Sequence, residues 1–365
     1  MNKPLRVALF GFGRVGRNIF RIGFKNPQFE FVAISDLGQP EAMHYLLMRD
    51  SIHGAMGDEI ELDGNNLIYN NHKVRLLEGG TPGLIPWDAY DIDLVIDSTG
   101  TYRTRDKLQP HLDAGAGRVF VTKPPEDQID RIIIKGINED TIDRNDKIIS
   151  TTSATTQVLA LMLKVLDDDF GVKQAMMTTV HAYTSDQPLA DAVRSDLRRS
   201  RSAVENIIPN ETWAPDYVSQ LMPQFKNKIA GMAMNVPVAN GSCVDLTTEM
   251  NEMPSIEEVN AAFKNASENS FKNIIGYTED PIVSSDAIGS GNTMVFDSKA
   301  TMIASNKLLK TIAWFDEVLD TWMGDCRSTG VLSLIDSEWK LDHYQLSVTI
   351  DNELMPQFLE ITKSD

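Results

Sequence analysis

The amino-acid sequence predicts an α/β fold: a doubly wound parallel sheet in the first half, followed by an α+β domain with a mostly antiparallel sheet. Two observations support this prediction. The first 40 residues alternate between short apolar runs, typical of buried strands, and an amphipathic helical pattern. After residue 170 the chain contains longer strand-like runs, many of them alternating between polar and apolar residues, separated by loops.

The first predicted strand, residues 5–10, leads into a glycine-rich turn. The turn consists of Gly11, Phe12, Gly13, Arg14, Val15 and Gly16. A helix is expected to continue over residues 17–24, and a second strand covers residues 29–34. The first glycine permits the tight turn, the second lets the backbone approach a pyrophosphate, and the third allows close packing of helix on strand. The phosphates then meet the helix amino terminus. This is the pattern of a Rossmann dinucleotide-binding unit.

Asp36 lies at the end of the second predicted strand, twenty residues after Gly16. A carboxylate at this place accepts both hydrogen bonds from the adenosine ribose diol, and it repels a 2′-phosphate. Asp36, followed by Leu37, therefore favours NAD over NADP as the cofactor.

Two further apolar runs, residues 94–97 and 118–121, are predicted strands that end in small or polar residues. Thr99 and Gly100 follow the first run closely, and Thr122 follows the second directly. Ligands of open parallel sheets bind at the carboxyl ends of the strands. A role in the cofactor site and an ordinary loop role are both open for these residues.

A change of pattern near Thr151 divides the chain. We expect an NAD-binding domain at 1–152, a catalytic-type α+β domain at 153–318, a helix at 319–334 that returns to the NAD-binding domain, and an acidic extension at 335–365. The later predicted strands cover residues 175–183, 228–236 and 242–250. Residues 306–319 form a helix or a strand, and residues 343–350 alternate like a strand.

Composition excludes several classes of function. Lys and Arg number 34 against 52 Asp and Glu, a formal charge of −18, so a nucleic acid would be repelled over most of the surface. The two cysteines, Cys243 and Cys326, are too few and too distant for a disulfide framework or a zinc motif, so we expect no metal site and a reducing cytoplasm. No apolar segment has the length of a signal peptide or a membrane span, so no membrane partner is expected.

Five segments carry a resemblance to a known family. They are Gly-Phe-Gly-Arg-Val-Gly-Arg at 11–17, Thr-Thr-Val-His-Ala-Tyr-Thr at 178–184, Asp-Leu-Arg-Arg-Ser-Arg at 196–201, Asn-Ile-Ile-Pro at 206–209 and Gly-Met-Ala-Met-Asn-Val-Pro at 231–237. Together they resemble the phosphorylating glyceraldehyde-3-phosphate and erythrose-4-phosphate dehydrogenases over nearly all of residues 4–316.

This resemblance implies that the NAD-binding half is largely intact. It assigns the turn around Arg14 and Val15 to the pyrophosphate, Asp36 to the adenosine ribose, and Thr99, Gly100 and Thr122 to the path toward the nicotinamide. One departure is Glu317, which stands where the family has the asparagine that orients the nicotinamide carboxamide. A carboxylate accepts hydrogen bonds but donates none, so it can hold the amide nitrogen and repels the amide oxygen.

The segment at 149–157, Ile-Ser-Thr-Thr-Ser-Ala-Thr-Thr-Gln, resembles the family's active-site segment with Ala154 in place of the nucleophilic cysteine. The family's reaction needs a thiolate that attacks an aldehyde, and a methyl group cannot replace it. His181 matches the catalytic histidine and has lost its thiol partner. Its alternative role is that of a hydrogen-bonded core residue.

The substrate side of the resemblance departs further. Asn235 stands where the family has the arginine that clamps substrate phosphate, and a neutral amide gives up that charge-assisted contact. Trp213 replaces a glycine of the phosphate loop, and we expect its indole to fill the anion site. Hydroxyl groups survive at Ser153, Thr155, Thr184 and Thr212. They form either a remaining anion site or helix caps and core contacts, and Ser153 is expected to cap a helix that begins near Ala154.

Three functions remain open. The chain is an NAD-binding pseudoenzyme with a regulatory or scaffold role. Alternatively, it is a non-covalent oxidoreductase that uses His181 as general acid or base on an unphosphorylated carbonyl or alcohol. In the third reading, Ala154 is an engineered replacement of cysteine in an active aldehyde dehydrogenase. All three leave room for a small-molecule ligand.

Three arginines, Arg198, Arg199 and Arg201, cluster in an otherwise acidic chain. Their segment, residues 187–201, resembles the one through which subunits of the family's tetramers pack together. We therefore expect a homotetramer in which these arginines pair with carboxylates at the subunit interface.

Overall fold

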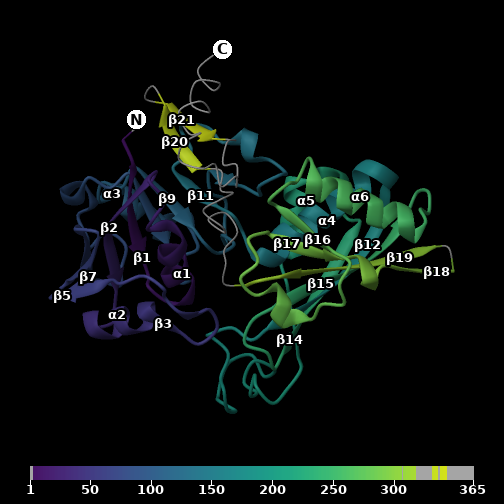
Figure 1. Ribbon diagram of the computed structural model, residues 1–365, viewed down its shortest axis with the longest axis horizontal. Coiled ribbons are helices and arrows are strands. Elements are labelled where there is room, and N and C mark those ends of the chain that lie inside the picture. The colour runs from purple at the N-terminus through teal and green to yellow at the C-terminus, as the bar shows by residue number, and fades with distance from the viewer. Residues whose placement is uncertain (1–2, 306, 318–330, 336–337, 343–365) are drawn as a thin grey trace.

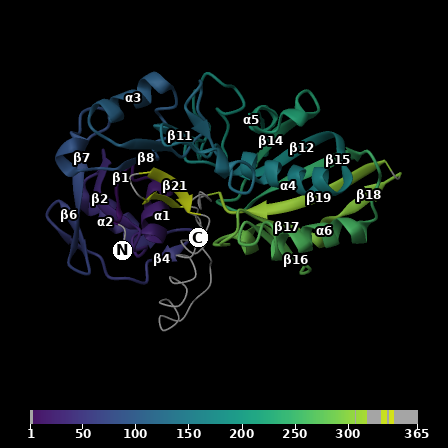
Figure 2. The same ribbon diagram turned by 90° about the horizontal axis from the view of Figure 1, so that it is seen from above.

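The computed structural model describes residues 3–305, 307–317, 331–335 and 338–342. They form two lobes that lie side by side in both views, an N-terminal lobe in purple and blue and a second lobe in green (Figure 1, Figure 2). Each lobe is built around its own sheet. No helix in the described ranges is both long and apolar enough to cross a membrane.

The first lobe contains a nine-stranded sheet of order β10-β11-β9-β8-β1-β2-β7-β6-β5. Neighbours from β10 to β7 run parallel, and the edge strands β6 and β5 are antiparallel. The strands are β1 (Leu5–Phe10), β2 (Phe29–Asp36), β5 (Glu61–Asp63), β6 (Asn66–Tyr69), β7 (His72–Glu78), β8 (Leu94–Asp97), β9 (Arg118–Val121), β10 (Arg131–Ile132) and β11 (Ile148–Ser150). The helices are α1 (Arg14–Gly23), α2 (Pro40–Met48) and α3 (Arg105–Asp113), and β3 (Arg49–Asp50) pairs with β4 (Gly54–Ala55). The predicted doubly wound parallel sheet is confirmed.

Helix α1 begins at Arg14, three residues before the expected start. Gly13 has extended backbone and is the N-cap, so the second half of the glycine turn already belongs to the helix. A Cβ at Gly16 would lie 2.3 Å from the carbonyl oxygen of Gly11, which shows how closely the helix approaches the end of β1. Gly11 itself has φ of +92°, a conformation that favours glycine.

The second lobe contains a sheet of order β13-β14-β12-β15-β19-β17-β16, with β18 paired to β19. Neighbours are antiparallel except for the pairs β12–β14 and β16–β17. The strands are β12 (Val172–Ala182), β13 (Ile208–Asn210), β14 (Ile229–Val236), β15 (Ser242–Met250), β16 (Ile275–Thr278), β17 (Met294–Asp297), β18 (Met302–Ala304) and β19 (Leu308–Phe315). The predicted α+β lobe is therefore confirmed, and the undecided segment at 306–319 contains a strand.

Three helices cover one face of the second sheet: α4 (Ala154–Phe170), α5 (Ala214–Leu221) and α6 (Ile256–Glu268). Helix α4 is the central one, because residues 158–163 are all fully buried between the sheet and the other helices. Phe263 of α6 stacks on Phe296 of β17 with ring centroids 3.8 Å apart. Short 3-10 turns complete the chain at Trp87–Tyr90, Glu139–Thr141, Pro223–Phe225, Ser284–Ala287 and Ser298–Ala300.

The carboxyl-terminal prediction is partly wrong. A helix was expected over residues 319–334, but residues 331–334 belong to strand β20 (Val331–Ile335), which pairs antiparallel with β21 (Glu338–Asp342). The run Val-Leu-Ser-Leu-Ile is short, and its β-branched ends, Val331 and Ile335, are compatible with a hairpin strand. Residues 319–330 and the strand predicted at 343–350 lie outside the described residues.

Candidate functional site

The carboxyl ends of β1 and β2 meet through the carboxylate of Asp36. Its Oδ2 accepts the N–H of Phe12 at 2.6 Å, and its Oδ1 accepts the N–H of Gly38 at 2.9 Å. Asp36 therefore ties the glycine turn to the loop after β2. Each carboxylate oxygen keeps a second lone pair, so acceptor capacity remains for a ribose diol.

The glycine turn leaves room for a ligand at one position only. A Cβ added at Gly13 would meet no atom within 4 Å, whereas one at Gly16 would collide with the backbone of Gly11. Gly13 thus borders open space at the amino terminus of α1, whose first turn contains no acidic residue. Val15 of the turn is partly buried. Leu37, in the loop that follows β2, is 77% exposed. This cradle fits a pyrophosphate.

Thr99, Gly100 and Thr122 lie at the same edge of the sheet, after β8 and β9. Thr99 donates its hydroxyl to Asp97 at 2.7 Å, and Gly100 has φ of +71°. Thr122 is 4% exposed, and its Oγ1 has no hydrogen-bond partner among the described residues. A buried hydroxyl without a partner is costly, and a bound ligand would satisfy it. The residues predicted to bind a dinucleotide are thus brought together.

The amino terminus of α4 forms the next part of the site. As predicted, Ser153 caps this helix: its hydroxyl accepts the N–H of Thr156 at 3.2 Å. Ala154 is the first helical residue and is partly buried. The preceding Thr152 is fully buried with φ of +66°, an unfavourable conformation for a β-branched residue. The tight turn that precedes α4 is therefore strained, and the residue that follows it at the start of the helix is Ala154.

His181 lies at the end of β12 and contacts Glu317, which follows β19. His181 Nδ1 is 2.8 Å from the carbonyl oxygen of Ala182 and 3.1 Å from Glu317 Oε1. The same Oε1 accepts the N–H of Ala182 at 2.8 Å. The carboxyl of Glu317, predicted to meet the nicotinamide carboxamide, thus has one oxygen engaged with protein groups.

Burial determines the ionisation of this pair. Burial lowers the pKa of His181 below its usual 6.5. The positive charge of Lys123 also lowers this pKa, whereas the hydrogen bond to Ala182 raises it. Burial also raises the pKa of Glu317 to about 8, although the Ala182 N–H, Arg14 and Lys123 oppose that shift. Burial thus favours the neutral form of both groups.

His181 lines a cavity of about 240 Å³ between the lobes' facing loops and α4. Its other polar lining residues are Lys123, Ser153, Thr155, Thr156, Thr179, Thr184, Asp186, Arg199, Asn210, Glu211, Thr212 and Asn235. Thr179 is 1% exposed, and its Oγ1 has no hydrogen-bond partner in the described part of the chain. Most side chains that line this cavity are thus polar.

Several predicted anion-binding groups already have protein partners. Thr184 donates its hydroxyl to Asp186, and the hydroxyl of Thr212 accepts the N–H of Ala214 at 3.3 Å. Thr155 is buried in the cavity wall. Asn235 is 6% exposed and donates to the carbonyl of Ala182 at 3.3 Å, so its amide supports the His181 loop. These contacts favour the structural role for Asn235, Thr184 and Thr212.

Two cationic residues that the sequence argument had not placed here line the cavity. Arg199, assigned to a subunit interface, forms an ion pair with Asp186 inside this pocket. Burial would raise the pKa of Asp186, but the Thr184 hydroxyl and Arg199 lower it overall. Lys123, directly after Thr122, is the second cation. The pocket therefore keeps two cationic side chains although residue 235 is a neutral asparagine.

The expectation for Trp213 is wrong. Its side chain does not fill the anion site, because the residue is 64% exposed and lies at the border of the cavity. Trp213 is the N-cap of α5, and the hydrogen bond from the Ala214 N–H to the Thr212 hydroxyl spans it at 3.3 Å. The indole thus leaves the pocket open.

No thiol in the described part of the chain faces His181. Cys243 pairs with Val180 across the β12–β15 ladder, and directly opposed residues project to the same face. Because side chains alternate along a strand, Cys243 lies on the opposite face of the sheet from His181. Burial raises the pKa of Cys243 to about 11. Cys326 lies outside the described residues.

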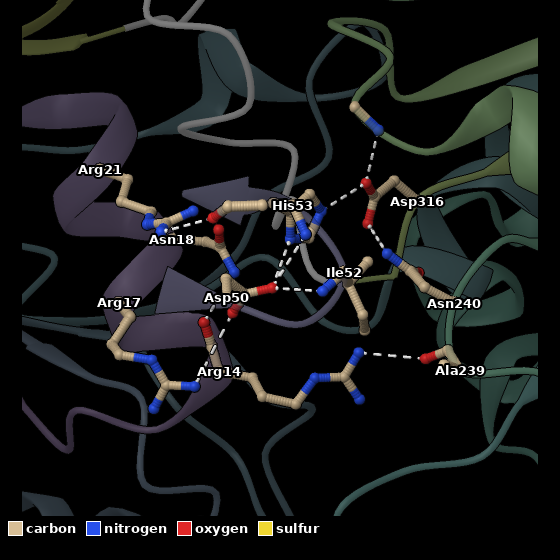
Figure 3. A network of polar contacts seen from close by, with 12 residues as sticks. Arg14, Arg17, Asn18, Arg21, Asp50, Ile52, His53, Ala239, Asn240 and Asp316 are labelled. Carbon is tan, nitrogen blue, oxygen red and sulfur yellow. Dashed lines mark hydrogen bonds and ion pairs between the residues drawn. The ribbon is translucent and has the colours of Figure 1, made fainter. Parts of the chain in front are cut away.

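A polar network holds the segment before Glu317 against the first lobe (Figure 3). His53 Nε2 lies 3.0 Å from Asp316 Oδ2, while its Nδ1 lies 3.5 Å from Asp50. Asn240 donates to the other oxygen of Asp316 at 2.7 Å. Arg14 donates to the carbonyl of Ala239 at 3.1 Å, so its guanidinium bridges the lobes. Glu317 is thus positioned by contacts from both lobes.

Comparison with known proteins follows the same division of the chain. Residues 5–105 match the family description "Glyceraldehyde 3-phosphate dehydrogenase, NAD binding domain", and residues 153–317 match "Glyceraldehyde 3-phosphate dehydrogenase, C-terminal domain". Glyceraldehyde-3-phosphate dehydrogenase 1 of Bacillus subtilis (strain 168) is 42% identical over 313 residues, which cover 86% of this chain and 93% of that protein. Glyceraldehyde-3-phosphate dehydrogenase of Geobacillus stearothermophilus is 41% identical with the same coverage.

Proposed function

Because the chain belongs to the glyceraldehyde-3-phosphate dehydrogenase family, with NAD as its cofactor, we propose that it binds NAD but has lost the family's covalent, phosphorylating reaction. The residue that carries this proposal is Ala154, at the first position of α4. A thioester route needs a thiolate at the aldehyde carbon. Ala154 offers a methyl group there, and Ser153 uses its hydroxyl for capping.

The other residues of the site support the same proposal. The pyrophosphate cradle at Gly13, the acceptor at Asp36 and the unpartnered hydroxyl of Thr122 fit a dinucleotide. Cys243 cannot replace the thiol, because it lies on the other face of the sheet. If Ala154 were a designed replacement of cysteine in an otherwise typical family member, position 317 would be an asparagine and position 235 an arginine. Both positions differ here, so we favour a natural loss of the cysteine. A regulatory or scaffold role of the NAD-bound protein is our first proposal.

Two assays on the purified chain test this proposal. We expect NADH to bind, seen as a change in its fluorescence, and Asp36→Ala to weaken binding about 10- to 100-fold, because hydrogen bonds to a charged group contribute roughly 1.5–3 kcal/mol. Glu41→Ala, an exposed acid on α2, is the matched control and should bind normally. Glyceraldehyde 3-phosphate with NAD and phosphate should give no NADH above background. Robust turnover would refute the proposal.

One observation favours a second function, a non-covalent NAD-dependent oxidoreductase. His181 lies in the wall of a polar cavity, and burial lowers its pKa and so favours the unprotonated imidazole that a general base for an alcohol requires. NAD, when bound, supplies the hydride acceptor for such chemistry. The same assay with unphosphorylated polyols, ketones and hydroxy acids distinguishes the two functions, because turnover that is lost in His181→Asn would establish the second.

We also propose that the chain forms a homotetramer in the cytoplasm. The face of the second sheet away from the helices exposes Met176 and Met232, at 69% and 37%. The nearby loop exposes Val193 and Leu197, at 104% and 83%. Apolar groups exposed together in this way are typical of subunit interfaces. The low cysteine count suits a reducing compartment.

Light scattering tests the assembly. We expect a particle of about four times the chain mass of 40.6 kDa, and we expect Met232→Asp to dissociate it by placing a charge in the apolar interface. Leu84→Asp is the control, because Leu84 is 70% exposed on the first lobe. A monomeric wild-type chain would contradict the proposal.

A further inference from the structure

Glu317 and His181 form a contact that neither cofactor binding nor the covalent route explains. The distance between Glu317 Oε1 and His181 Nδ1 is 3.1 Å, and the two side chains keep only 11% and 23% of their surface exposed. Such a buried pair of titratable groups, at the edge of a polar cavity, is an arrangement typical of proton-transfer sites.

Backbone contacts fix both partners. The N–H of Glu317 donates to Asn240 Oδ1 at 3.0 Å, and Asn240 is in turn held by Asp316. On the other side, His181 Nδ1 has the Ala182 carbonyl as acceptor at 2.8 Å. This hydrogen bond assigns the imidazole hydrogen to Nδ1, so the lone pair of Nε2 is left for the cavity that His181 lines.

The hydrogen-bond pattern also locates the carboxyl proton. Glu317 Oε1 accepts the Ala182 N–H and faces the Nδ1–H of His181, so it serves only as an acceptor. When Glu317 is protonated, the hydrogen is therefore on Oε2. The charged groups around the pair are Lys123 and Asp186 at His181, and Arg14, Lys123 and Asp316 at Glu317.

We propose that Glu317 is the positioning residue and proton partner of His181, so that His181 gains a proton at Nε2 while Glu317 releases its own proton from Oε2. This inference rests on the second function proposed above. A substrate hydroxyl gives its proton to Nε2, and the imidazole becomes an imidazolium. The carboxylic acid becomes a carboxylate 3.1 Å from the Nδ1–H, and its proton leaves to solvent. The net charge of the buried pair is the same before and after.

Constant charge is the advantage of this arrangement. An isolated imidazolium in a buried site is unfavourable, because it loses its hydration. A carboxylate at hydrogen-bond distance offsets that loss, and the pair titrates as a unit with two apparent pKa values. The consequence is that His181 accepts protons over a wider pH range than a buried histidine next to a neutral amide.

Modification by diethyl pyrocarbonate, which acylates unprotonated imidazole, tests this proposal without substrate or cofactor. The rate at His181, followed by peptide mass spectrometry on the full-length chain, should keep rising in the wild type up to about pH 8. In Glu317→Gln we expect one step, with its midpoint at least about one pH unit lower. Glutamine keeps an acceptor oxygen for Ala182 and His181, so a purely structural role would leave the midpoint unchanged.

Glu211→Gln is the matched control, because Glu211 is an exposed acid that lines the same cavity. It should give the wild-type profile. Glu317→Asn, which also cannot ionise, replaces Glu317→Gln if that variant does not fold, and should give the same lower midpoint. Coinciding profiles for the wild type and the position-317 variants would overturn the inference. A shifted midpoint without turnover of any substrate would leave the inference intact and reject the oxidoreductase function.

Discussion

Replacing Ala154 with cysteine is expected to produce an aldehyde-oxidising enzyme, with NADH formation from glyceraldehyde 3-phosphate at least about a hundredfold above the wild-type background. The reason is the place of residue 154 at the first position of the 17-residue helix α4. A helix amino terminus stabilises a thiolate. Ser153 and Thr155, its neighbours on either side, both line the cavity that contains His181.

The KM of Ala154→Cys for glyceraldehyde 3-phosphate should show how much substrate affinity is lost through Asn235. Asn235 is engaged with the Ala182 carbonyl and carries no charge, so the phosphate group of the substrate is weakly held. We expect Ala154→Cys/Asn235→Arg to lower KM by roughly 10- to 100-fold, the contribution of one charge-assisted contact. Ala154→Ser is the control for size and polarity, and it should remain inactive.

The alkylation rate of the cysteine introduced at position 154 shows whether its environment activates the thiol. The new thiol should be alkylated at pH 7 several times faster than an ordinary thiol, whereas buried Cys243, with its raised pKa, should react slowly in both proteins. If the new thiol shows ordinary reactivity and no NADH forms, position 154 is not placed for attack on an aldehyde, and the assignment of Ala154 to the nucleophile position is refuted.

The cofactor half could be predicted from the sequence because its rules are local. The spacing from Gly11 to Gly16 and on to Asp36 is dictated by one strand–turn–helix unit, and the structure places Asp36 Oδ2 2.6 Å from the N–H of Phe12. Capping of α4 by Ser153 is equally local, since donor and acceptor are three residues apart.

The contact between His181 and Glu317 could not be predicted in this way. Both residues were recognised as site residues, but they are far apart in sequence and meet only because β15 lies between β12 and β19. Ser242 shows this order directly: it pairs with Phe315 in one ladder, and its hydroxyl accepts the N–H of Ala182. The order of strands in a mixed sheet depends on packing of the whole lobe, which no local pattern specifies.

Loop conformation explains why the sequence did not predict the positions of Arg199 and Trp213. Arg199 lies in a loop without strand or helix periodicity, so its pairing with Asp186 has no sequence pattern behind it. Trp213 was placed by analogy with a glycine, but an indole needs far more space than a hydrogen atom. The chain meets that need by turning the ring outward at the start of α5.

Glu317→Gln is expected to stabilise the folded chain, and the gain should grow with pH. The pKa of Glu317 is raised to about 8 in the folded state, against an ordinary value of 4.5. Below pH 4.5 both states are protonated and the residue is neutral to stability. Between about pH 4.5 and 8 the unfolded state ionises first, so stability falls as pH rises, by at most roughly 1.4 kcal/mol per unit.

The measurable quantity is the difference in thermal unfolding midpoint between Glu317→Gln and the wild type, followed from pH 4.5 to 9. This difference should be near zero at pH 4.5 and reach several degrees at pH 8.5. The reason is that each kcal/mol of stability shifts the midpoint by roughly 2–4 °C in a lobe of this size. The lowered pKa of His181 costs stability only below pH 6.5, so the rise of the difference above that pH reports Glu317. A difference that stays constant with pH would mean that Glu317 is ionised throughout, and that its contact with His181 is an ordinary ion pair with no proton to release.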